Sequence, residues 1–106
     1  MKIAFSLEVS LSKTICMEFY KIVEMPCLPP VGCTIFLNEG SGNLNEIKVL
    51  GLTWHENYPN IFELILNTIS LDGDPDDNKK WLEELGWSTK HWIDLISGNG
   101  SNGNQR

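Results

Sequence analysis

Residues 3–11, which read IAFSLEVSL, alternate strictly between large apolar side chains and small or polar ones. A period of two places the apolar side chains on one face of a β-strand and the others on the opposite face. This pattern is typical of a strand in an antiparallel sheet that has one buried and one wet face. We therefore expect a mainly β fold built around this segment. The apolar members are Ile3, Phe5, Leu7, Val9 and Leu11.

Four further segments have β-strand character, and together with the first they predict a five-stranded antiparallel sheet. The expected strands are 3–11, 14–25, 33–38, 46–56 and 61–71. Pro26, Pro29 and Pro30 separate the second strand from the third, because proline has no N–H group for a strand ladder. The last two strands are apolar on both faces. Either the sheet curls into a barrel, or helices cover its second face.

Two short helices are expected near the C-terminal end, over 75–85 and 89–97. Asp74 is a suitable N-cap, Pro75 suits the first helical position, and Gly86 suits the end of the first helix. Ser88 suits the start of the second helix. Residues 98–106 are rich in Gly, Asn and Ser, which predicts a disordered tail. The expected organisation is one α+β, mainly β, domain over 1–97.

The segment LPPVGCTI, residues 28–35, is followed by long strands. It resembles the proline loop and following strand of small SH3-like or OB-like barrels. The resemblance implies a strongly curved sheet or a small barrel, here closed by the two C-terminal helices.

The charge balance restricts the classes of partner. Fourteen acidic and eight basic residues give a net charge of −6. This argues against nucleic acid and against anionic membranes as partners, because both attract basic surfaces. It favours solubility or a basic protein partner. Glu8 and Lys13 interrupt the apolar N-terminal stretch, which argues against a signal peptide. Three cysteines are an odd number, whereas a small secreted domain more often has an even set. We therefore expect a cytoplasmic protein.

An acidic loop is the best candidate for a cation site. Its acids follow the oxygen-ligand spacing of an EF-hand calcium loop, but Asp77 stands where the sharp turn requires Gly. The alternative is a helix start, with acids placed at the positive end of the helix dipole. The candidate ligands are Asp72, Asp74, Asp76, Asn78 and Glu83.

The segment WLEELGWSTKHWI, residues 81–93, contains Leu-Gly-x-Ser between two expected helices. It resembles the turn of helix-turn-helix DNA-binding domains. The resemblance implies a DNA-binding regulator that uses residues 76–97, with Lys90 and His91 on the recognition helix. Acidic residues such as Glu83 and Glu84 oppose that function, and the alternative is a helix pair packed on the sheet.

Tryptophan is concentrated in the same segment, where three of the four occur within twelve positions. Short helices can bury two of these rings, and Trp87, at the corner after Gly86, is expected to stay partly exposed. Exposed aromatic side chains surrounded by acids are typical of protein-binding surfaces. The alternative is that all three rings belong to the core. The predicted partner-binding residues are Trp81, Trp87, His91 and Trp92.

These observations favour a non-enzymatic interaction or adaptor domain that binds another, basic protein. An inhibitor or an immunity protein is one form of this function. No cofactor is expected, and a homodimer formed through the first strand is left open for the case that this strand lies at an edge of the sheet. The alternatives are the DNA-binding regulator and a small metal-dependent enzyme, which only the acidic loop and the free thiols support.

Overall fold

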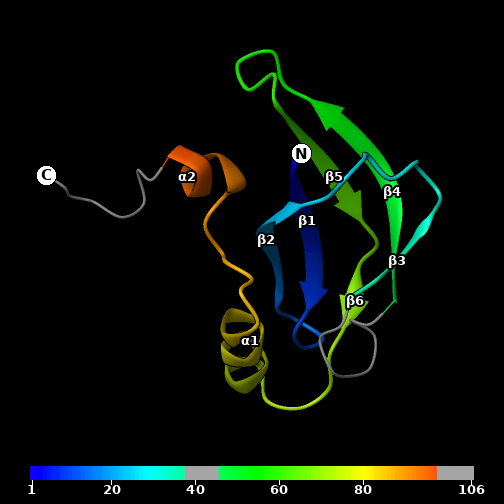
Figure 1. Ribbon diagram of the computed structural model, residues 1–106. Helices are drawn as coiled ribbons and strands as arrows, with labels where there is room; N and C mark the ends of the chain where they lie inside the picture. Colours follow the sequence, from blue (N-terminus) through cyan, green and yellow to red (C-terminus); the bar gives the residue numbers. More distant parts are fainter. Residues whose placement is uncertain (38–45, 98–106) are drawn as a thin grey trace, which may run out of the picture.

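The computed structural model describes residues 1–37 and 46–97, and within them it forms a mixed six-stranded sheet with two short helices (Figure 1). The expectation of a mainly β chain with two C-terminal helices is confirmed. Expectations about Asn38, the end of the third strand, and about the tail at 98–106 lie outside the described residues. The elements are β1 (Lys2–Ser10), β2 (Cys16–Glu24), β3 (Thr34–Phe36), β4 (Glu46–Trp54), β5 (Ile61–Leu66), β6 (Ile69–Ser70), α1 (Pro75–Glu84) and α2 (Trp92–Ser97).

The strand order is β2-β1-β5-β4-β3, with β6 beside the end of β1. β1 pairs antiparallel with β2, but it pairs parallel with β5 and β6. The expected all-antiparallel sheet is therefore wrong at β1, because the chain crosses from β2 to the other side of the sheet before β3 and β4 form. β2 and β3 are the two edges, so the sheet is open and does not close into the barrel that the SH3-like or OB-like resemblance implied.

The expected strand at 61–71 is divided at Asn67 and Thr68. The backbone N–H of Asn67 donates to the carbonyl of Lys48 at 3.1 Å, and its side-chain oxygen accepts from the N–H of Lys48 at 2.7 Å. These bonds end the pairing with β4, after which the chain moves toward β1 and forms β6. A β-bulge between Val49 and Gly51 also interrupts the β4–β5 ladder.

The second helix begins at Trp92 rather than at residue 89. Ser88 does not cap it: its backbone N–H and C=O bond to the backbone of Tyr20 on the edge of β2, and its hydroxyl accepts from the N–H of Lys90, before the helix begins. The helix start is held instead by His91, whose Nδ1 accepts from the N–H of Ile93 at 3.2 Å. The first helix agrees with expectation, including the N-cap Asp74.

The two faces of the sheet bury different cores. The inner face carries the apolar set of β1 and packs against Leu82 of α1 and against Trp87. The outer face carries Ala4, and there Trp92 of α2 anchors a smaller cluster with Tyr20 and Ile61. No helix among the described residues has the length and apolar character needed to cross a membrane.

Candidate functional site

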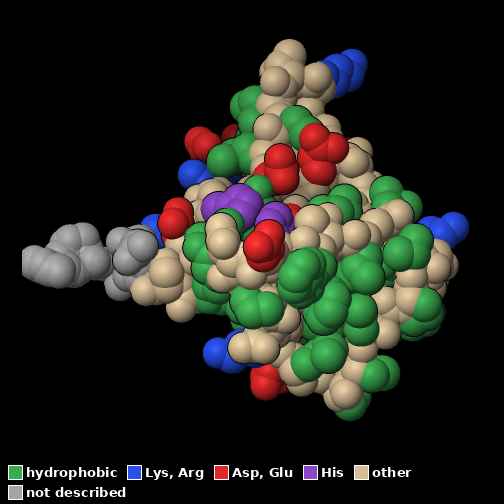
Figure 2. Space-filling view, turned by 90° about the horizontal axis from the view of Figure 1, so that it is seen from above, with side chains coloured by type: hydrophobic (Ala, Val, Ile, Leu, Met, Phe, Trp, Pro, Cys, Tyr) green, Lys and Arg blue, Asp and Glu red, His purple; other side chains and the backbone are tan. Residues whose placement is uncertain are grey.

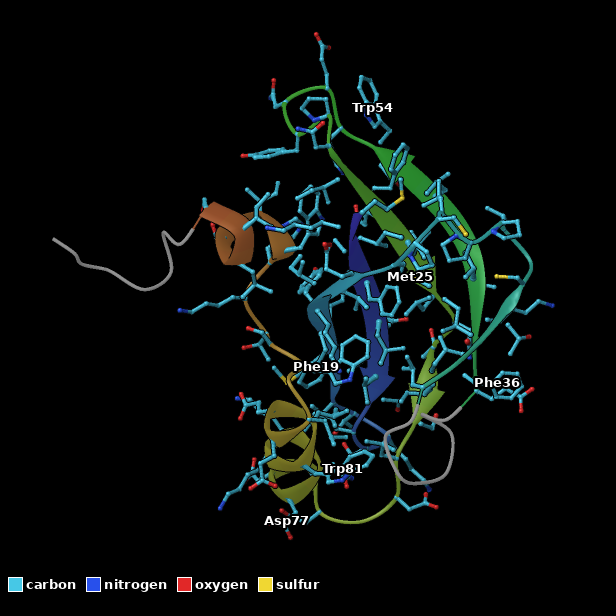
Figure 3. The ribbon with its side chains drawn as sticks, in the orientation of Figure 1. Phe19, Met25, Phe36, Trp54, Asp77 and Trp81 are labelled. Atoms are coloured by element: carbon cyan, nitrogen blue, oxygen red, sulfur yellow. The ribbon has the colours of Figure 1, made fainter. Side chains whose placement is uncertain are left out.

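Trp87 and Trp92 are core residues. Trp87 is only 2% exposed, so the expectation that it stays partly exposed is wrong. Gly86, at φ 98°, turns the chain back toward the sheet, and the Trp87 ring stacks on Phe5 with centroids 6.3 Å apart. Trp81 of α1 is half-buried beside the same core (Figure 3). The buried pair therefore attaches the C-terminal segment to the sheet and does not offer surface to a partner.

His91 belongs to an aromatic cluster that holds α2 on the outer face. Trp92 is fully buried. The centroid of its ring lies 5.1 Å from that of His55, 5.5 Å from that of Tyr58 and 5.5 Å from that of His91. His91 also contacts Tyr20 at 4.9 Å. Figure 2 shows the two histidines close together, with acidic side chains around them. Of the predicted partner-binding residues, His91 and Trp81 keep part of their surface exposed.

The acidic loop forms a helix start rather than a cation cage. Asp74 Oδ2 accepts from the N–H of Asp77 at 3.1 Å, and Asn78 Nδ2 donates to the carbonyl of Asp72 at 3.0 Å. Glu83 lies in the last turn of α1. In residues 1–37 and 46–97, no group of three or more His, Cys, Asp or Glu side chains could hold a metal ion. The predicted ligands, Asp76 included, are not brought together as a calcium site.

The two helices do not form a helix-turn-helix motif. α1 contributes Leu82 to the inner cluster, whereas α2 contributes Trp92 to the outer cluster. Both helices therefore pack on the sheet, as the alternative expected, but they do so on opposite faces. α2 contains only six residues, and Trp92, the first of them, is buried against the sheet.

Beyond α2, no described residue covers the outer face of the sheet, and this part of the face is hollowed. The hollow has a volume of about 370 Å³ and crosses β2, β1, β5 and β4. We call this surface the outer groove. It is lined by Ser6, Glu8, Glu18, Leu50, Glu63, Ile65, Leu66 and Thr68.

Three carboxylates of the outer groove are oriented by uncharged or weakly basic donors. Glu8 Oε1 accepts from the hydroxyl of Thr68 at 2.8 Å, and Glu18 Oε1 accepts from the hydroxyl of Tyr20 at 3.0 Å. Glu63 Oε1 lies 3.2 Å from Nε2 of His55. Glu8 and Glu18 are directly opposite each other in the β1–β2 ladder, an arrangement of like charges that destabilises a sheet.

Burial and the nearby carboxylates together raise the pKa values of two neighbouring groups. Burial raises the pKa of Tyr20 to about 12, helped by its hydrogen bond to Glu18 and by the charges of Glu18 and Glu63. Desolvation raises the pKa of the Cys16 thiol, and the Glu8 carboxylate that accepts its hydrogen bond adds to the effect, as does Glu18. Both groups hold their protons more tightly chiefly because desolvation disfavours the charged form, and the nearby negative charges add to this effect. The outer groove is thus suited to positively charged groups.

The side of the outer groove nearer β4 is apolar. Leu50 is 55% exposed and Ile65 is 36% exposed. Gly51 pairs with Ile65, and a Cβ added at Gly51 would lie 3.7 Å from Ile65 Cβ. The absence of a side chain at Gly51 therefore leaves Ile65 accessible. An exposed aliphatic pair beside the exposed carboxylates of Glu8 and Glu18 can contact a ligand that is both apolar and basic.

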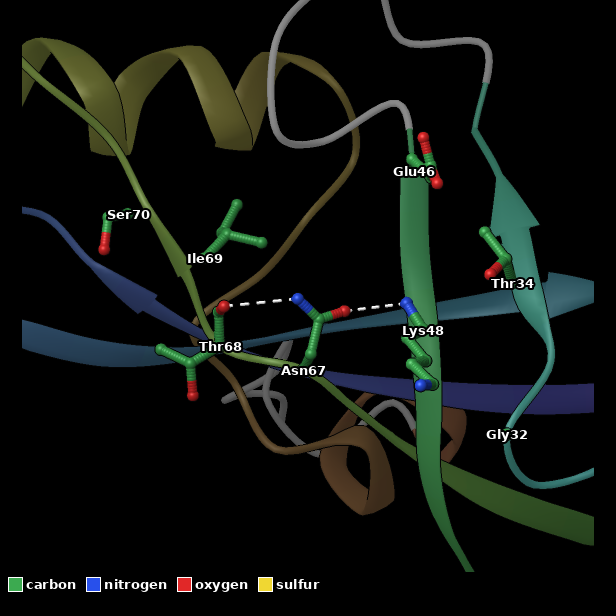
Figure 4. A pocket seen from close by; sticks show the side chains of 8 residues that line it. All are labelled: Gly32, Thr34, Glu46, Lys48, Asn67, Thr68, Ile69 and Ser70. Atoms are coloured by element: carbon green, nitrogen blue, oxygen red, sulfur yellow. Dashed lines mark hydrogen bonds between the residues drawn. The ribbon is translucent and has the colours of Figure 1, made fainter.

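A larger polar pocket of about 780 Å³ lies between β4 and the β5–β6 connection (Figure 4). Asn67 crosses it, with hydrogen bonds to the N–H of Lys48 and to the carbonyl of Thr68. Glu46 and Lys48 at its rim have opposite charges, so the pocket favours neither sign of ligand.

Comparison of the chain with protein-family models, with curated proteins and with solved structures finds no match. Function is therefore inferred from the geometry of the outer groove.

Proposed function

We propose that this protein is a non-enzymatic interaction domain that binds a basic partner protein through the outer groove. The observation that carries the proposal is the presence of two exposed carboxylates and two exposed aliphatic side chains on one part of a sheet face that no described residue covers. The net charge of −6 supports it, because an acidic protein attracts a basic partner over long distances. An inhibitor or an immunity protein is one form of this function.

The two halves of the outer groove contribute differently to binding. Glu8 and Glu18 are exposed, and exposed charges mainly accelerate association and select the partner. Leu50 and Ile65 supply apolar surface that loses water on contact, which is the main source of affinity in a small interface. A basic partner with apolar side chains next to its charges would use both halves.

The tryptophans have an indirect part in this proposal. Trp92 holds α2 over Ala4, Tyr20 and Ile61. The position of α2 therefore fixes which part of the outer face is covered, and the outer groove begins beyond it. Substituting Trp92 would disturb the covered part of the outer face and would not remove a direct contact to a partner. The proposed contact residues are therefore those of the outer groove.

The proposal is tested by affinity capture from source-cell lysate with a tagged protein in three forms. These are the wild type, the Glu8→Gln/Glu18→Gln variant, and a Glu56→Gln/Glu84→Gln control, which changes net charge equally at exposed sites away from the groove. We expect mass spectrometry to identify a basic protein that the wild type and the control retain and the groove variant loses. Equal capture by both variants, or no specific capture by the wild type, would contradict the proposal.

A further inference from the structure

The strands beneath the centre of the outer groove have no free edge. β1 lies between β2 and β5, and β5 lies between β1 and β4. A partner segment that added a strand would need unpaired N–H and C=O groups at a sheet edge, and here those groups are used by the neighbouring strands. A helix satisfies its own backbone hydrogen bonds, so it can lie on the face of a sheet.

The uncovered surface has room for one helix. It extends from Glu18 on β2 to Leu50 on β4, three inter-strand spacings that together measure about 14 Å. A helix with its side chains is about 10 Å across. α2 already occupies the other part of the same face, where Trp92 packs on Ala4. A partner helix beside α2 would complete the layer over the sheet.

The distribution of side chains gives the chemistry of that helix. The acids Glu8 and Glu18 lie on β1 and β2, whereas the aliphatic side chains of Ile65 and Leu50 lie on β5 and β4. A helix that runs along the strands on this surface would place lysine or arginine over the first pair of strands and apolar side chains over the second pair. Adjacent basic and apolar stripes are a property of a basic amphipathic helix.

Resting on the proposed function, we propose that the outer groove binds one basic amphipathic helix of the partner protein. The helix lies on the sheet face beside α2. Its lysine or arginine side chains contact Glu8 and Glu18, and its apolar side chains pack on Leu50 and Ile65.

The test uses three fluorescein-labelled peptides of about 18 residues, a length of about 27 Å when helical. The first carries leucine at helical spacing with lysine on the adjacent stripe. The second has the same composition with leucine and lysine distributed evenly around the helix. The third is the first with two interior alanines replaced by proline, which breaks a helix. Binding is measured by fluorescence anisotropy, and circular dichroism reports helix formation.

We expect the first peptide to bind at least about tenfold more tightly than the other two, because only it presents both stripes on a helix. Leu50→Ser and Glu8→Gln/Glu18→Gln should each weaken it about fivefold. The exposed residue Val31, outside the groove, supplies the control Val31→Ser, which should leave binding unchanged.

Equal binding of the helical and proline peptides, or of the striped and evenly distributed peptides, would overturn the helix inference. Absence of binding by all three would also overturn it. The proposed function would survive either result if the protein captured from lysate still depended on Glu8 and Glu18. If that dependence failed as well, both proposals would fall together.

Discussion

Neutralising Glu8 should stabilise the folded protein while it weakens binding of a basic partner. Glu8 is directly opposite Glu18 in the β1–β2 ladder, so two negative charges face each other across neighbouring strands. Glutamine keeps the side-chain oxygen that accepts from Thr68 and removes only the charge. The variant Glu8→Gln thus tests the repulsion with little change in shape.

The size of the effect follows from the spacing of the strands. Directly opposite Cβ atoms lie about 5 Å apart, and two unit charges about 6 Å apart in water repel by about 0.7 kcal/mol. Physiological salt roughly halves this value. We expect Glu8→Gln to raise the free energy of unfolding by about 0.3–0.4 kcal/mol, which corresponds to an increase in Tm of about 1–3 °C in a chain of this size.

The same ladder provides a matched control. Glu24 is opposite Lys2, so Glu24→Gln changes net charge equally but removes an attraction. Urea denaturation should show Glu24→Gln to be no more stable than the wild type. In the double variant Glu8→Gln/Glu18→Gln, the second substitution should add almost nothing, because the first has already removed the repulsion.

High salt distinguishes this explanation from a change in packing. At high ionic strength the advantage of Glu8→Gln should shrink, because the Debye length falls to about 3 Å at 1 M salt. The reasoning is refuted if Glu8→Gln is less stable than the wild type, or if Glu24→Gln is stabilised equally. Equal stabilisation would mean that only the overall net charge matters.

Three further experiments test other parts of the structure. The folded protein keeps the Tyr20 proton until about pH 12, while an unfolded tyrosine loses it near pH 10. The free energy of unfolding of the wild type should therefore fall between these two pH values. In urea denaturation, Tyr20→Phe should lack the part of this fall that comes from Tyr20. Cys16 and Cys27 are both exposed, yet mass spectrometry at mildly alkaline pH should show slower alkylation by iodoacetamide at Cys16, and Glu8→Gln should accelerate it. Trp92→Ala should lower the free energy of unfolding by about 3 kcal/mol in urea denaturation, because a fully buried ring is lost.

The alternation in residues 3–11 predicted the buried face of β1 correctly. The apolar positions from Ile3 to Leu11 are all at most 2% exposed. The cap at Asp74 and the proline at 75 likewise predicted the start of α1. These features are local, because side-chain periodicity and helix capping depend on residues a few positions apart.

The neighbours of β1 could not be predicted in the same way. A period of two shows which side chains share a face, but it does not show which strand lies beside it or in which direction that strand runs. The parallel pairing of β1 with β5 joins residues about sixty positions apart, such as Ile3 and Phe62. The burial of Trp87 also depended on this topology, since its ring packs on Phe5 in the centre of the sheet.

Half of the outer groove depends on a local hairpin. A hairpin that turns near Lys13 pairs residues whose numbers add to 26, and this register places Glu8 opposite Glu18. Leu50 and Ile65 join them only because β5 lies next to β1 and β4 lies next to β5. The acidic side of the groove is therefore a short-range feature of the sequence, and the apolar side is a consequence of the strand order.

The outward positions of β1 explain why the outer face is divided into a covered and an open part. Ala4 is fully buried beneath the Trp92 cluster, and its small side chain lets the indole approach the sheet. Glu8 lies four residues further along β1 and points to the same face, but it is exposed and lies opposite a second acid. Stability alone would favour lysine there, since opposite charges across a ladder attract. An acid at this position is understandable if the positive charge comes from another protein, which is the role proposed for the outer groove.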